Sequence, residues 1–235
     1  MSRVSVLVVT MIILCLGLAP EASGGSVQGT VVFDDAPPRL PTLDMAADPA
    51  CQAKHKGSVQ ARILELGPGK TMGNVFVQVK NAPPANRPVP KEPVIIDQVG
   101  CLYQPRVVGV MAGQPLLFRN SDRLMHTVRS QSTTNRPFNL GMPPMIPEDV
   151  VTLNKPEPIF PVKCDIHPWM QAYVAVMSHP YFDVTGTDGK FSIDGLPAGT
   201  YTIEAWHERL GTQSQRVTVP ASGAVTADFS FQTPK

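Results

Sequence analysis

The sequence is short of aromatic residues, of net charge and of apolar runs with helical spacing. Aromatic side chains make up 6% of its 235 residues, and 20 basic against 19 acidic residues leave a formal charge of +1. A chain with no basic patch and few aromatic residues lacks the features that bind nucleic acid. With 25 prolines, 18 glycines and no apolar stripe of helical period, it predicts an all-β protein of short strands joined by turns.

An apolar stretch near the start of the chain, Val4 to Ala19, follows a single basic residue, Arg3, and precedes small residues at positions 22–24. This pattern predicts a secretory signal peptide over residues 1–23. Its apolar part is shorter than the roughly 20 residues that a membrane span needs, and an uncleaved anchor is the alternative. Lipid attachment at Cys15 is disfavoured because the preceding residues, Ile12–Leu14, are bulky. We expect a periplasmic or secreted protein with no membrane association after cleavage.

Three metal donors stand at Cys-x-x-His-x-x-Met spacing: Cys164, His167 and Met170. A mononuclear blue-copper site takes two His and one Cys in a plane with a weak axial Met. The missing imidazole is predicted to be His126, just beyond the apolar run 115–118. Zinc is the chemical competitor, but structural zinc favours four Cys or His ligands and a thioether binds it poorly. A binuclear copper centre would need a second Cys in the loop.

Around these ligands, roughly residues 94–178, the chain resembles the cupredoxins, and the short loop looks most like the amicyanin type. Segments 104–110 and 116–120 look like the strands before the first ligand His, 161–163 like the strand entering the Cys, and 173–177 like the closing strand. The resemblance implies a Greek-key β-sandwich with one type 1 copper per chain. One departure is Thr127, where many cupredoxins have an Asn that braces the ligand loop.

The resemblance also implies how redox partners dock. In the family the loop His reaches the surface through an apolar patch, which here would be formed by Trp169, Pro168, Met142 and Pro143. Such encounters use small, weak interfaces. The expected partner is a c-type cytochrome or a dehydrogenase.

Two cysteines remain if residues 1–23 are removed and Cys164 binds metal. Cys51 and Cys101 then form a natural disulfide pair, which fits an oxidising exported compartment. Two free buried thiols are the alternative.

Period-two alternation recurs along the rest of the chain. Segments 27–33 and 74–80 are predicted strands, separated by a long irregular stretch, 34–72, and 81–93 is a proline-rich linker. Segment 184–193 is predicted to be a hairpin with a tight turn at Asp188-Gly189. Further strands are expected within 196–206, 215–219 and 225–231.

This last part resembles the carboxypeptidase regulatory-like, or transthyretin-like, β-sandwich, through Thr187-Asp188-Gly189 and Leu196-Pro197-Ala198-Gly199-Thr200-Tyr201. About 50 residues is thin for such a sandwich. We therefore expect a second, small sandwich whose first strands come from the N-terminal segment, with the cupredoxin inserted into it. The expected division is 1–23 signal peptide, 24–82 N-terminal β segment, 83–179 cupredoxin domain and 180–235 regulatory-like module.

Three other histidines are not expected to bind metal. His55 lies between two lysines and is predicted to be solvated, whereas His179 and His207 are predicted to make local hydrogen bonds. With one cupredoxin unit and no second copper site, the chain is expected to be an electron carrier rather than an enzyme. A copper storage or delivery protein, or a structural recognition module, is the alternative.

Overall fold

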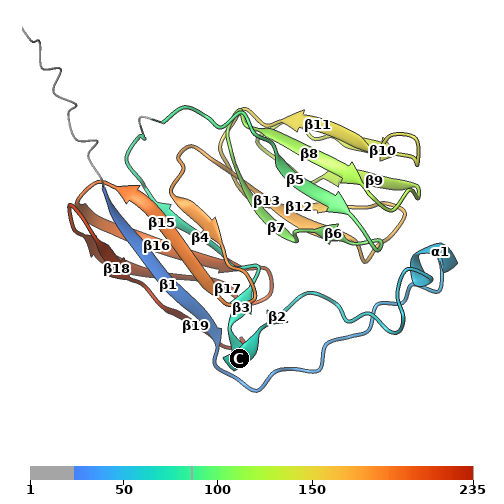
Figure 1. The fold of residues 1–235 in the computed structure, drawn as a ribbon, viewed down its shortest axis with the longest axis horizontal. Coiled ribbons are helices and arrows are strands. Elements are labelled where there is room, and N and C mark those ends of the chain that lie inside the picture. The colour runs from blue at the N-terminus through green and yellow to red at the C-terminus, as the bar shows by residue number, and fades with distance from the viewer. Residues whose placement is uncertain (1–23, 86, 235) are drawn as a thin grey trace, which may run out of the picture.

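The computed structural model describes residues 24–85 and 87–234, which form two β-sandwich lobes lying side by side (Figure 1). Within these residues the helices are α1, Pro49–Gln52, and a 3-10 turn, Pro68–Lys70. The predicted all-β class is confirmed. No helix in the described part is long and apolar enough to cross a membrane. The expected signal peptide, residues 1–23, lies outside the described residues.

The first lobe, called here the inserted lobe, contains strands β5 to β13, all within the expected domain 83–179. One sheet has the order β10 (Asn139–Met142), β9 (His126–Ser130), β12 (Glu157–Lys163), β13 (Gln171–Met177) and β7 (Val107–Met111). The other has the order β11 (Glu148–Thr152), β8 (Pro115–Asn120), β5 (Val94–Gln98) and β6 (Tyr103–Gln104). Alternate residues of β8, Leu116 and Phe118 among them, point into the core between the sheets.

The second lobe, called the terminal lobe, combines both ends of the described chain. Its strands are β1 (Gly25–Phe33), β4 (Phe76–Lys80), β14 (Phe182–Val184), β15 (Lys190–Leu196), β16 (Gly199–His207), β17 (Gly211–Val219), β18 (Ala224–Thr226) and β19 (Phe229–Phe231). One sheet has β1 between β15 and β18, with β19 also pairing with β1; the other has the order β14-β4-β16-β17. Figure 1 shows the blue β1 among orange and red strands. The N-terminal strands thus supply the partners that the short C-terminal segment lacks.

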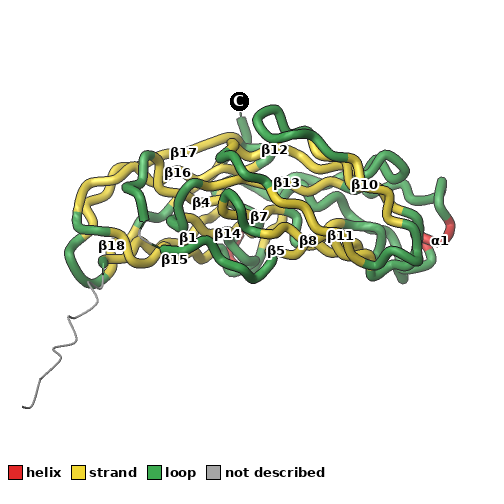
Figure 2. Tube along the Cα trace, turned by 90° about the horizontal axis from the view of Figure 1, so that it is seen from above, coloured by secondary structure: helices red, strands yellow, loops and turns green. Residues whose placement is uncertain are grey.

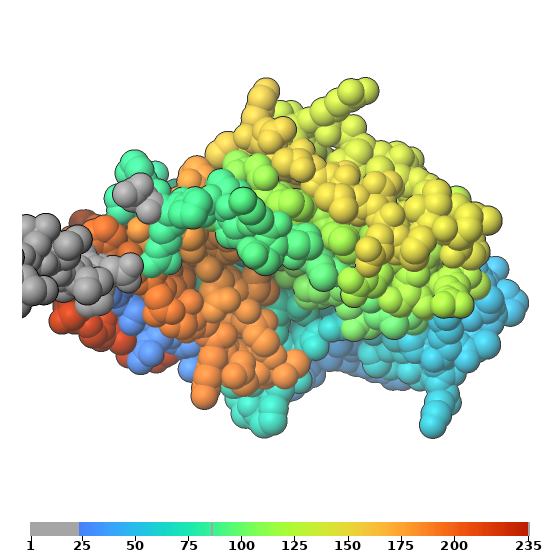
Figure 3. Space-filling model, turned by 45° about the horizontal axis from the view of Figure 1, so that its top comes forward, coloured from blue at the N-terminus to red at the C-terminus, as the bar shows by residue number. Residues whose placement is uncertain are grey.

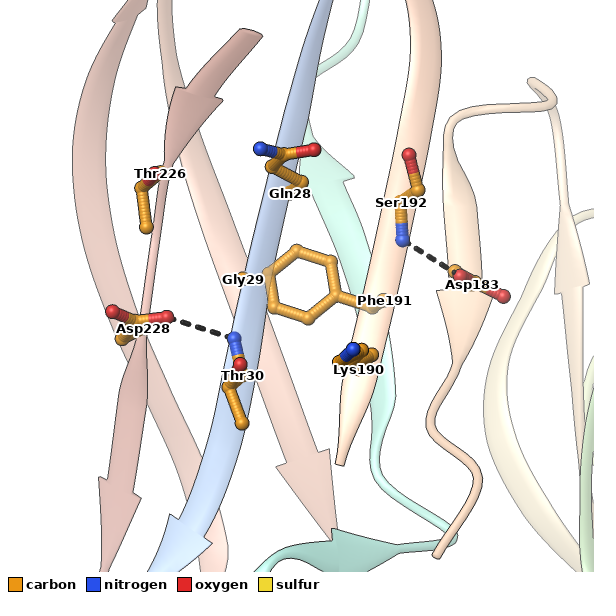
Figure 4. A pocket seen from close by; sticks show the side chains of 9 residues that line it. All are labelled: Gln28, Gly29, Thr30, Asp183, Lys190, Phe191, Ser192, Thr226 and Asp228. Carbon is orange, nitrogen blue, oxygen red and sulfur yellow. Dashed lines mark hydrogen bonds between the residues drawn. The ribbon is translucent and has the colours of Figure 1, made fainter. Parts of the chain in front are cut away.

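The predicted hairpin at 184–193 is wrong in its pairing. Gly189 has a positive φ and donates its N–H to Gly186 O, so the turn exists, but β14 pairs with β4 and β15 pairs with β1. The turn therefore carries the chain from one sheet to the other. Figure 4 shows the side-chain link that remains, in which Asp183 accepts the backbone N–H of Ser192 at 2.9 Å.

The two lobes meet in a small apolar cluster. Phe76 of the terminal lobe packs with Val107, Ala175 and Met177 of the inserted lobe. Beside this cluster, Arg106 forms a bidentate ion pair with Glu208 of the terminal lobe. A buried ion pair and an apolar contact together fix the two sandwiches against each other.

Residues 34–72, called here the excursion, leave the terminal lobe and run along the inserted lobe. The segment reaches α1 at the far end of the inserted lobe and returns through β2 (Glu65–Leu66) and β3 (Met72–Gly73) (Figures 1 and 2). In the space-filling view it packs against the inserted lobe (Figure 3). A disulfide between Cys51 and Cys101, with Cα atoms 5.6 Å apart, fastens it there.

Candidate metal centre

The ligand loop, residues 164–170, connects β12 to β13 and folds back on itself. Met170 donates its backbone N–H to His167 O at 2.9 Å, and Cys164 donates to Met170 O at 3.2 Å. These bonds hold the three donors of the loop on one compact turn. His126 begins β9, which pairs with β12 directly before the loop. The sheet thus brings the distant imidazole to the loop.

The donor atoms of His126, Cys164 and His167 all lie within 4.8 Å of one another, in a position that could hold a metal ion. The two Nδ1 atoms are 3.0 Å apart, and Cys164 Sγ lies 3.7 Å from His167 Nδ1. Metal–nitrogen bonds of about 2.0 Å and a metal–sulfur bond of about 2.3 Å hold donors roughly 3.3–3.8 Å apart. These two distances fit a single ion within a few tenths of an ångström. All three side chains are buried.

A carboxylate contacts the outer nitrogen of each imidazole. Asp122 Oδ2 lies 3.1 Å from His126 Nε2, and Asp48 Oδ2 lies 2.9 Å from His167 Nε2. An ionised carboxylate can only accept, so each ring in its neutral form presents its Nε2–H outward and its Nδ1 lone pair inward. Two nitrogen lone pairs and a sulfur then face one point. That arrangement is repulsive unless a proton or a metal ion lies between them, and a metal ion would satisfy all three donor atoms at once.

The Cys164 thiol is prepared to lose its proton. Burial alone would raise its pKa, but hydrogen bonds from His126, from the Thr127 N–H and from loop N–H groups lower the pKa to about 6. The thiolate is the form that binds metal. Thr127 also holds the loop, because its Oγ1 accepts the Asp165 N–H at 2.7 Å. The hydroxyl therefore braces the loop at the position where Asn was missing.

The contact between His126 and Asp122 favours the charged form of both groups. Burial would lower the pKa of His126, but its bonds to Asp122 and Cys164 outweigh burial and raise it. Burial would raise the pKa of Asp122, but His126, the Cys101 N–H and Lys54 lower it. The pKa of Asp48 is lowered chiefly by its bond to His167. Both carboxylates therefore stay ionised beside the rings.

Met170 is fully buried in the same core cluster as Cys164. Its thioether is the remaining soft donor of the ligand loop. The structure thus gathers the three expected His and Cys ligands, and it places Met170 inside the same loop and core.

The expected docking patch is partly wrong. Met142 is fully buried, because its place opposite His126 in the β10–β9 ladder turns it inward and its sulfur accepts an N–H from Gln98. His167 is only 1% exposed, because Asp48 of the excursion covers its outer edge. Trp169 is half-buried and donates its indole N–H to Cys101 O at 3.0 Å. Pro143 is half-buried as well, and of the four residues only Pro168 is freely exposed.

The predicted disulfide between Cys51 and Cys101 is present, and it lies against the centre: Cys51 Sγ is 3.5 Å from His167 Nε2. His55, predicted to be solvated, is half-buried, and its Nε2 lies 2.8 Å from Gly100 O. The residues that sequence reasoning missed are Asp48 and Asp122. Their only local signals were an Asp-Pro helix start and an acidic residue four positions before His126.

His179 and His207 make the local bonds expected of them. His179 Nδ1 accepts the Tyr181 N–H at 3.2 Å, and His207 Nδ1 accepts the Arg209 N–H at 3.3 Å. Burial lowers the pKa of both rings, that of His207 to about 4. Neither belongs to a group of potential metal donors among the described residues.

Comparison with known proteins gives one family match. Residues 168–232 match the carboxypeptidase regulatory-like domain. The match begins inside the ligand loop and includes β13, although that strand pairs with β12 and β7 of the inserted lobe. No curated protein matches the chain.

Solved structures of copper proteins resemble part of the chain. A copper-containing nitrite reductase from Thermus scotoductus SA-01 is 22% identical over 43% of this chain, with a TM-score of 0.34. The chain spans only 25% of that reductase. A Cu(I) structure of an amicyanin variant is 17% identical over 43% of this chain and 98% of its own, with a TM-score of 0.33. A purple cupredoxin from Nitrosopumilus maritimus is 18% identical over 36% of this chain and 98% of its own, with a TM-score of 0.30. The family match thus covers residues 168–232, and these structural likenesses cover 36–43% of the chain.

Proposed function

We propose that the chain binds one copper ion through His126, Cys164, His167 and Met170 and carries single electrons between redox partners outside the cytoplasm. The observation that carries this proposal is the convergence of two imidazole lone pairs and a low-pKa thiol on one buried point. A copper ion at that point would supply one-electron chemistry. The chain's own residues would hold it and exclude water.

The donor set favours copper over zinc. Zinc in a structural site takes four Cys or His ligands, whereas the ligand loop offers a buried thioether as its fourth donor. Two His, one Cys and a weak Met are the ligands of a blue-copper electron-transfer site.

Electron transfer is favoured over storage or delivery by the way the centre is closed. A protein that hands on its metal needs a route for ligand exchange. Here His167 is covered by Asp48, and the covering segment is fastened by the Cys51–Cys101 disulfide. Ligands that are held in place by the surrounding protein move little between the two oxidation states of the metal, and this suits fast electron exchange. The disulfide also supports the periplasmic or secreted location.

Partners such as a c-type cytochrome or a dehydrogenase would dock on the exposed edge of the ligand loop. Ile166 is 45% exposed and Pro168 is exposed, and they flank the buried His167. Behind them the Trp169 ring lies 5.1 Å from the His167 ring. These residues replace the exposed His as the proposed route for the electron.

The deciding experiment is a Cu(II) titration of the purified exported protein, followed by visible and electron-spin spectra. We expect one copper per chain, an intense thiolate-to-copper band and small copper hyperfine splitting. Cys164→Ser should abolish the band, because serine cannot supply the covalent sulfur donor. A colourless stoichiometric zinc complex isolated from the native host would contradict the copper assignment.

A further inference from the structure

The two imidazoles of the centre are held by two carboxylates, and each carboxylate is tied to one half of the disulfide. Asp48 Oδ1 accepts the backbone N–H of Cys51 at 3.2 Å, and its Oδ2 faces His167 Nε2. Asp122 Oδ2 accepts the backbone N–H of Cys101 at 2.7 Å and also faces His126 Nε2. The Cys51–Cys101 bond therefore joins the two supports behind the metal centre.

The two supports differ in origin. Asp122 belongs to the inserted lobe and is buried, with its side chain 1% exposed. Asp48 comes from the excursion, where it caps α1 by accepting the N–H groups of Ala50 and Cys51. Its contact with His167 exists only while the excursion stays in place. Besides the disulfide, Lys54 holds the excursion by donating to Asp122 O at 3.1 Å.

The same atoms could be read as a second metal site, because Asp48, Cys51 and His167 also lie within ligand distance of one another. Cys51 is not available as a thiolate, since its sulfur is bonded to Cys101. The Nε2 side of the His167 ring is therefore assigned a hydrogen bond to Asp48 rather than a second metal ion.

We propose that Asp48, held against the ring by the Cys51–Cys101 disulfide, is a positioning residue that fixes His167 with its proton on Nε2 and strengthens Nδ1 as a metal donor. This inference rests on the proposed copper function. A carboxylate bonded to the outer nitrogen of a ligand His fixes its tautomer and raises its basicity, and loss of such a partner costs about 10- to 100-fold in metal affinity. Cu(II) should gain more from the added negative charge than Cu(I).

The test is Asp48→Asn, which keeps the oxygen that caps α1 but removes the charge facing His167. The matched control is Asp44→Asn, because Asp44 lies in the same excursion, accepts the Ala46 N–H and is exposed. In metal-free protein, nitrogen NMR should find His167 wholly in the Nε2–H form in wild type and in Asp44→Asn, and mixed in Asp48→Asn.

In copper-loaded protein, Asp48→Asn should weaken Cu(II) binding by about 10- to 100-fold in competition with a chelator. If Cu(I) binding is unchanged, this corresponds to a rise in reduction potential of about 60–120 mV, at 59 mV per tenfold. An unchanged tautomer together with an unchanged Cu(II) affinity would overturn the inference.

The role of the disulfide is tested by combining Cys51→Ala and Cys101→Ala with and without Asp48→Asn. If the bridge acts by holding Asp48, the Cys pair should reproduce the tautomer mixture, and adding Asp48→Asn should change it little further. Full additivity of the two changes would refute the coupling. Failure of wild type to bind copper would refute the proposed function instead, whereas the tautomer measurement would still decide whether Asp48 fixes His167.

Discussion

Glu208→Gln should cost about 3 kcal/mol of unfolding free energy, because it breaks the buried ion pair between the lobes. Glu208 accepts two bonds from the Arg106 guanidinium and one from the Tyr173 hydroxyl at 3.1 Å. The side chains of the ion pair are 10% and 5% exposed. Removing one partner of a buried pair strands the other charge, at a cost of about 3–5 kcal/mol. Gln keeps one acceptor oxygen, so we expect the low end.

The measurement is urea denaturation of metal-free protein at pH 7, followed by circular dichroism. The control is Glu148→Gln, which breaks an exposed pair with Arg119 whose side chains are 46% and 41% exposed. Exposed pairs contribute about 0–1 kcal/mol, so the control should stay close to wild type. Replacing both buried partners, Arg106→Met with Glu208→Leu, should recover most of the loss, because an apolar pair leaves no stranded charge. Equal losses in Glu208→Gln and Glu148→Gln would refute the reasoning.

Four further outcomes are expected. Met170→Leu should keep a blue site but raise its reduction potential in voltammetry, because loss of a weak axial donor destabilises Cu(II) more than Cu(I); the buried control Met177→Leu should not. Glu157→Gln should cost about 2–3 kcal/mol, because the carboxylate accepts hydrogen bonds from four consecutive residues, 132–135. Burial would raise the pKa of Glu157, but those bonds lower it to about 2. The stabilisation that the ionised carboxylate gives to the folded state is therefore present above pH 4.5 and is lost as the pH falls toward 2. An unfolding free energy of wild type that stays flat from pH 5 to pH 2 would contradict this. Ile166→Glu should slow bimolecular electron exchange without changing the copper spectrum, whereas Val150→Glu, an equally exposed change on β11, should leave the rate unaltered.

The ligand loop could be predicted because its information is local. Three donors within seven residues need only a tight turn to meet. The spacing of Cys164, His167 and Met170 therefore indicates a copper-type donor set without knowledge of the fold. His126 was harder, yet its place after an apolar strand was enough. The carboxylate behind His167 could not be predicted in the same way. Asp48 reaches the ring only because the excursion crosses the surface of another lobe, and a polar loop pattern does not say what the loop touches.

Two errors have physical causes that the sequence partly contained. Asp188-Gly189 correctly indicated a turn, but turn chemistry fixes only the local backbone and not the sheet that each flanking strand joins. Met142 was placed on the surface by resemblance, although alternation along Asn139-Leu140-Gly141-Met142 puts its side chain on the inner face. In this case the local pattern was the better guide.

The sheet order of the terminal lobe has a consequence for the order in which the chain folds. β1 pairs with β15, β18 and β19, and the bond from Thr30 N–H to Asp228 spans 198 residues. The strands of the inserted lobe pair only among themselves, so that lobe can close as soon as its own residues are made. Contacts between residues that are distant in sequence form slowly, because the entropy of closing a long loop is lost before the contact stabilises the chain. β1 is therefore the earliest described strand to be synthesised and one of the last to find its neighbours, and during that interval its edges stay open to pairing with other chains.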